Sequence, residues 1–138
     1  MVYSDEYLYS KDIDWFCVIN GYYVHVASAG DLLPAVINDR EILRDLQHQV
    51  AIAEDIFNDD EIIVNDVFLQ NRFQGVQNQV DSYLESFISM ARKGFISIDK
   101  TRFGDPEDKN YHIVCRPREP RALQGYNGIH IFEGIHEP

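Results

Sequence analysis

Two apolar runs flank the dipeptide Asn20-Gly21 in the first part of the chain. Residues 15–19 read Trp-Phe-Cys-Val-Ile, and residues 22–26 read Tyr-Tyr-Val-His-Val. Asn-Gly is the pair that best tolerates positive φ at both centres of a two-residue hairpin turn. The pattern therefore predicts a β-hairpin in which Cys17 lies opposite Val24.

The same register places Phe16, Tyr23 and His25 together on one face of the predicted hairpin. Both faces of the hairpin are largely apolar, and only one of them can be explained by the main core. We therefore expect the face that carries these three aromatic rings to be covered by a helix, another chain or a ligand.

A helical pattern follows the hairpin. Asn38 is a favourable helix cap, and Glu41 three residues later completes the pattern of a capping box. The helix should begin there and end in the acidic run at residues 58–61. Its apolar stripe has spacings of 4, 4, 3 and 4 residues and consists of Ile42, Leu46, Val50, Ala53 and Phe57.

Residues 62–91 contain an ambiguous segment followed by a second helical pattern. Residues 62–73 fit either a short strand or a helix capped by Asn65, and the amide-rich residues 70–79 resemble a connection. From Val76 to Ala91 the apolar residues again follow helical spacing, and Gly94 is a typical helix stop.

Two strand patterns, residues 95–99 and 111–116, predict a second hairpin around the polar loop at residues 100–110. Residues 129–133 are a candidate last edge strand. The resulting order, β-β-α-(?)-α-β-β-β, predicts an α+β fold for residues 1–138 as one compact domain. We expect an antiparallel sheet built from the N- and C-terminal hairpins, with two main amphipathic helices covering one face.

The charge is strongly acidic, with 23 Asp and Glu against 12 Lys and Arg, for a net charge of −11. Residues 1–90 contain 16 acidic and 4 basic side chains, so the acidity belongs to the N-terminal part. This sign argues against nucleic acid as a ligand. No window is apolar enough for a membrane span, and the N-terminus lacks a signal-peptide pattern, so we expect a cytoplasmic protein without membrane association.

Both cysteines, Cys17 and Cys115, lie within apolar strand patterns. In a reducing compartment such residues are usually small buried side chains, and we expect them to be reduced. Catalysis by Cys115 with His112 as the base is disfavoured, because residues three apart in a strand point to opposite faces.

No other residue pattern points to catalysis or to a cofactor. The five histidines lack the spacing of a metal site, and no segment matches a calcium or phosphate-binding loop, so we expect no metal and no cofactor. The paired carboxylates Asp12 and Asp14 are interpreted as solvated surface. Tyr3, Tyr7 and Tyr9 are either a binding strip or residues that pack against the core.

The leading hypothesis is a small noncatalytic binding protein that is comparable in charge and size to inhibitor or immunity proteins. Its partner would be a basic protein. The predicted binding residues follow the first long helix, where the helix dipole makes negative charge unfavourable and a neutralising partner would help. They are Asp55, Asp59, Asp60 and Glu61.

Two alternatives remain. Arg116, Arg118 and Arg121 could bind an anion or the acidic part of a second copy, which would give self-association. A second class of function is a small-molecule-binding domain or an enzyme that uses an aromatic and histidine-bearing sheet face. The residues predicted for that site are Tyr23, His25, His112 and Arg116.

Overall fold

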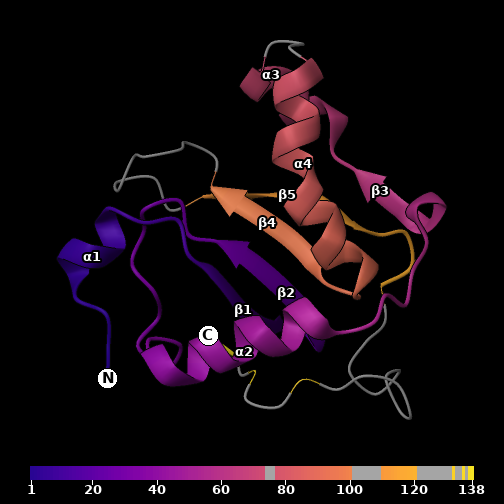
Figure 1. The fold of residues 1–138 in the computed structure, drawn as a ribbon. Coiled ribbons are helices and arrows are strands. Elements are labelled where there is room, and N and C mark those ends of the chain that lie inside the picture. Colours follow the sequence, from indigo (N-terminus) through magenta and orange to yellow (C-terminus); the bar gives the residue numbers. More distant parts are fainter. Residues whose placement is uncertain (74–76, 101–109, 121–131, 133–134, 136) are drawn as a thin grey trace.

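The fold is a five-stranded sheet with its main helices packed on one face (Figure 1). The computed structural model describes residues 1–73, 77–100, 110–120, 132, 135, 137 and 138. The strand order is β1-β2-β4-β5-β3. The strands are β1 (Asp14–Ile19), β2 (Tyr22–Ala27), β3 (Ile62–Val64), β4 (Ile96–Lys100) and β5 (Tyr111–Pro117).

The predicted first hairpin is confirmed together with its register. Cys17 lies opposite Val24, and the turn residues Asn20 and Gly21 have φ values of 53° and 82°. Positive φ at both positions is what a type I′ turn requires, and it explains why this dipeptide sets the pairing.

The sheet is mixed, whereas the sequence pattern suggested purely antiparallel pairing. The two predicted hairpins are present as β1-β2 and β4-β5, but they meet through a parallel pair between β2 and β4. The chain leaves β2, passes through the helices and re-enters beside it in the same direction, as crossover connections do. β3 adds antiparallel to the outer side of β5. The α+β class is confirmed.

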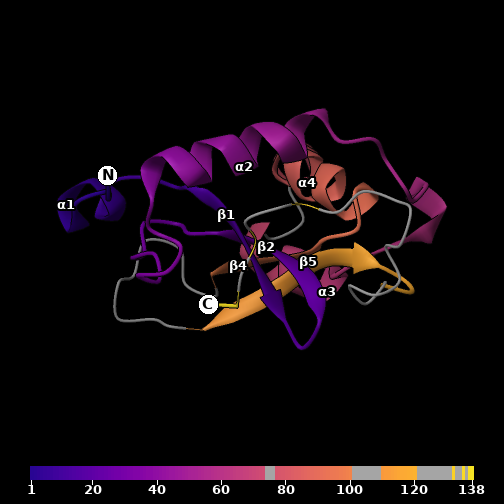
Figure 2. The ribbon, with the colours of Figure 1, turned by 90° about the horizontal axis from the view of Figure 1, so that it is seen from below.

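Two long helices, α2 (Arg40–Ile52) and α4 (Gln77–Arg92), lie on the same side of the sheet, as Figure 2 shows. Leu46 and Val50 of α2 pack in one cluster with Phe16 and Tyr23. Helices are therefore the cover that the aromatic face of the first hairpin requires. The opposite face of β1 and β2 packs on α1 (Asp5–Tyr9), on the segment before α2 and on the first turn of α2. The side chains that make this contact are Leu8, Leu33, Ile37 and Leu43.

The ends of α2 and the first position of its buried stripe differ from the prediction, while Leu46, Val50, Ala53 and Phe57 are buried as predicted. Asp39 is the cap, since its Oδ1 accepts a hydrogen bond from the Ile42 backbone N–H, and Asn38 instead bonds the backbone of Tyr3. The helix ends at Ile52, before the acidic run. Leu43 is 1% exposed and Ile42 is 53% exposed, so the buried stripe begins one residue later than the spacing indicated.

Both interpretations of residues 62–73 are correct, each for a part of the segment. The strand β3 comes first, and α3 (Asp66–Phe73) follows it. Asn65 caps α3, because its Oδ1 accepts a hydrogen bond from the backbone N–H of Phe68. The candidate strand at residues 129–133 lies outside the described residues except for Phe132. Within the described part of the chain, no helix has the length and apolar character needed to span a bilayer.

Cys17 and Cys115 are both fully buried free thiols. Burial raises the pKa of each thiol to about 12. Since the thiolate is the reactive form, we expect a thiol reagent to modify the native protein far more slowly than the denatured chain. Mass spectrometry after timed labelling measures this, and rapid labelling of the native protein would contradict the burial of the two thiols.

Candidate binding groove

The predicted acidic binding residues lie beyond the end of α2, in the loop and the short 3-10 helix η1 (Asp59–Glu61). Arg92 at the end of α4 contacts Asp59 through two hydrogen bonds of 2.6 and 3.1 Å. The bond from Arg92 lowers the pKa of Asp59. Asp59, Asp60 and Glu61 form η1 and do not belong to the last turn of α2. The unfavourable interaction of their negative charge with the C-terminal end of a helix dipole is therefore reduced.

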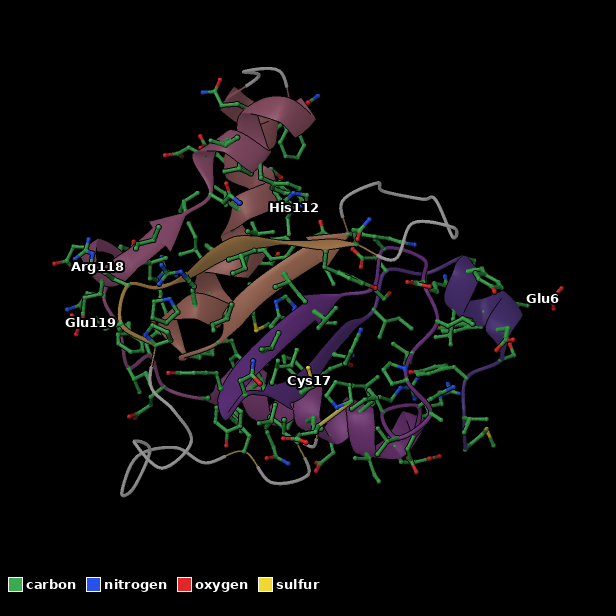
Figure 3. All side chains as sticks on the ribbon, turned by 180° about the vertical axis from the view of Figure 1, so that it is seen from behind. Glu6, Cys17, His112, Arg118 and Glu119 are labelled. Atoms are coloured by element: carbon green, nitrogen blue, oxygen red, sulfur yellow. The ribbon has the colours of Figure 1, made fainter. Side chains whose placement is uncertain are left out.

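Asp55, Asp60 and Glu61 also contact other residues of the chain. The Nζ of Lys93 lies 3.8 Å from the carboxylate of Asp55, and an Nη of Arg118 donates to the backbone carbonyl of Asp60 at 2.9 Å. Glu61 accepts a hydrogen bond from the Asn58 backbone N–H. Arg118 is labelled in Figure 3, where it lies beside this segment and at the opposite end of the molecule from Glu6. The residues of the acidic cluster thus contact other parts of the same chain.

The residues predicted for a small-molecule site occupy different environments. Tyr23 and His25 are each 1% exposed and lie under the helices. His112 is exposed and stacks on Phe68 of α3, with ring centroids 5.2 Å apart. Arg116 points to the end of β5, where it donates to the carbonyl of Pro117. The role predicted for these four residues in ligand binding stays a prediction.

His25 belongs to a buried hydrogen-bond chain that the sequence did not reveal. Its Nε2 lies 2.8 Å from an oxygen of Asp14, and its Nδ1 lies 3.0 Å from the hydroxyl of Ser97 on the neighbouring strand. The parallel pairing of β2 with β4 places His25 opposite Ser97. Only the Asp14 end is accessible, with 49% of its side chain exposed.

A carboxylate, an imidazole and a hydroxyl in a row can activate a serine nucleophile. Here the Ser97 side chain is 0% exposed, and Phe16 and Phe87 pack against the His25 ring. A substrate therefore has no path to this hydroxyl in the structure. The arrangement satisfies both ring nitrogens of a buried imidazole, as burial of a polar group requires.

An open groove of about 460 Å³ lies at Asp14, the accessible end of the Asp14–His25–Ser97 hydrogen-bond chain. Asp12, just before β1, and Asp14, the first residue of β1, both line it. Phe16, Ala51 and Met90 supply apolar walls. The groove thus combines two acidic side chains with a partly apolar lining, contributed by β1, α2 and α4.

Each of the two carboxylates has one engaged oxygen. Asp12 accepts a hydrogen bond from the Ala29 backbone N–H through Oδ1, and Asp14 is bound to His25 through its Oδ1. In the described residues, the second oxygen of each has no partner. Burial raises the pKa of Asp12, and the neighbouring carboxylates of Asp99 and Asp14 raise it further. A positive charge placed near Asp12 would therefore favour its ionised carboxylate.

Two tyrosines from the N-terminal segment complete the rim. The rings of Tyr3 and Tyr7 stack at 4.9 Å, and the guanidinium of Arg40 and the ammonium of Lys11 each lie 5.7 Å from a ring centroid. Of the three tyrosines, Tyr3 packs against the core, whereas Tyr7 and Tyr9 are 41% and 51% exposed, and their role as a binding strip stays a prediction. Arg44 of α2 also lines the groove.

A second cleft, of about 520 Å³, lies beside the acidic cluster and is lined by side chains that include Glu61, Arg118 and Glu119. Its charges are mixed. Among the described residues, no group of three His, Cys, Asp or Glu side chains could hold a metal ion. Comparison with known proteins gives no significant match to a family model, a curated protein or a solved structure.

Proposed function

We propose that this chain is a noncatalytic binding protein for a basic protein partner, and that the groove at Asp12 and Asp14 is its contact site. The observation that carries the proposal is that Asp12 and Asp14 both line the groove and that, among the described residues, the second carboxylate oxygen of each has no hydrogen-bond partner. Opposite charge at such a site raises association rates and selects the partner.

The acids at residues 55–61 make a weaker contact site, because the carboxylates of Asp59 and Asp55 already lie near Arg92 and Lys93. A partner would have to displace these contacts, and exposed charge pairs return little free energy. The first 54 residues, by contrast, contain nine acidic and three basic side chains and provide most of the groove. The groove is therefore the preferred surface.

The test compares two variants with the same change in net charge. Asp12 and Asp14 are both changed to Asn in the first variant, and Asp59 and Asp60 are both changed to Asn in the second. Asparagine keeps an oxygen that can accept the bonds from Ala29 and His25. A partner isolated from the native host at low salt is titrated with each variant across a salt series.

We expect the groove variant to bind at least about tenfold more weakly at low salt and to show a flatter salt dependence. The matched variant at residues 59 and 60 should lose less than about threefold. Equal affinity and equal salt dependence for wild type and both variants would overturn the proposal. A larger loss in the second variant would assign binding to the acidic cluster instead.

A further inference from the structure

We propose that the groove receives one arginine side chain, with its guanidinium at the open oxygens of Asp12 and Asp14 and its aliphatic stem along the apolar walls. This inference rests on the proposed function, since the arginine would belong to the basic partner. Its basis is the match between the two parts of the groove and the two parts of that side chain.

The charged end of the groove suits a guanidinium. Two carboxylates offer two open oxygens, and the planar guanidinium carries several N–H donors in a fixed fork. The 49% exposure of the Asp14 side chain leaves its outer part accessible. A hard metal ion is a poorer occupant, because it prefers more oxygen ligands than these two residues provide.

The walls suit the stem of the same side chain. Ala51 and Met90 border the groove without charge, and long basic side chains bury their methylene stems along such surfaces. The groove volume of about 460 Å³ is ample for one side chain. The molecule already places a guanidinium on this rim, where Arg40 lies over the Tyr3 ring.

Arg44 opposes the ligand, because it lines the groove with the same sign of charge. No ion pair joins it to Asp12 or Asp14 in the described part of the chain. Its removal should therefore tighten the binding of an arginine probe, while neutralising Asp12 should weaken it. Opposite effects of two substitutions on one groove separate charge recognition from general damage to the fold.

The experiment titrates the ¹⁵N-labelled full chain with a blocked arginine, N-acetyl-arginine methylamide, and follows amide chemical shifts by NMR. Blocked citrulline is the neutral control of equal shape. We expect a dissociation constant in the millimolar range, with shifts at residues 12–16 and 44–51, and no comparable shifts with citrulline. Asp12→Asn should weaken binding about tenfold, and Arg44→Gln should strengthen it.

Asp66→Asn is the matched control, because it removes the same charge at the start of α3, at the far end of the molecule from α1 (Figure 1). It should leave the affinity unchanged. Thermal unfolding of Asp12→Asn should show equal or greater stability than wild type, since burial and neighbouring carboxylates disfavour the charged form of Asp12.

The inference is overturned if the arginine probe moves no groove amide at tens of millimolar, if citrulline acts equally, or if calcium or magnesium alone occupies the groove in its place. Partner binding that still depends on Asp12 and Asp14 would then leave the proposed function standing. The converse result, an arginine-binding groove to which partner binding is insensitive, would overturn the proposed function alone.

Discussion

Replacing Leu43 by Ala should destabilise the protein by about 3 kcal/mol, whereas the same change at its neighbour Ile42 should cost less than about 1 kcal/mol. Leu43 is 1% exposed and packs with Trp15 and Val24, so its removal leaves a cavity that rigid strands cannot fill. Ile42 is 53% exposed and loses little contact. Denaturant unfolding measures both free energies.

This pair tests which residue is buried in the first turn of α2, because the two residues differ by one position and have nearly equal side-chain volume. The periodicity of the sequence favoured Ile42 as the buried residue, and the structure favours Leu43. A loss at Ile42 equal to or larger than that at Leu43 would show that Ile42, as the sequence spacing indicated, is the buried residue of the first turn.

The second large effect should follow the change of His25 to Ala, with a loss of about 3 kcal/mol in the free energy of unfolding. The change removes a ring that packs between Phe16 and Phe87, and it leaves the buried hydroxyl of Ser97 without its imidazole partner. The substitution therefore has two costs: it leaves a cavity, and it removes a buried hydrogen bond. Urea titration at neutral pH provides the measurement.

His48→Ala is the control, because His48 is exposed on α2 and should change stability by less than about 0.5 kcal/mol. Ser97→Ala should fall between the two, since it removes two hydrogen bonds, to His25 and to the Phe87 carbonyl, and little volume. If His25→Ala unfolds at the same urea concentration as His48→Ala, the buried hydrogen-bond chain does not contribute to the fold.

The candidate site was only partly visible in the sequence. His25 was recognised as a residue of an unusually apolar strand face, but Ser97 lies 72 positions away and became its partner through the parallel pairing of β2 and β4. Asp12 and Asp14 were interpreted as solvated surface. An alternation of acids around a buried Ile13 was the only local sign that one edge of a strand carries both carboxylates toward the same side.

The acidic run at residues 55–61 shows why charge patterns are weak guides to binding. In the sequence it followed a long helix and lacked a counter-ion. In the structure it meets the end of α4, where Arg92 and Lys93 approach from more than thirty residues away. Contacts over such separations depend on how the helices pack, which no local pattern encodes.

The sequence by itself determined the elements whose stability is local: the hairpin at Asn20-Gly21, the two long amphipathic helices, the second hairpin, and the α+β class. Turn geometry and side-chain periodicity act over a few residues, so they can be recognised in the linear pattern. The tertiary structure decided the rest. It set the parallel β2-β4 pair, the residue buried in the first turn of α2, the partners of His25 and the groove at Asp12 and Asp14, because each depends on which distant surfaces exclude water together.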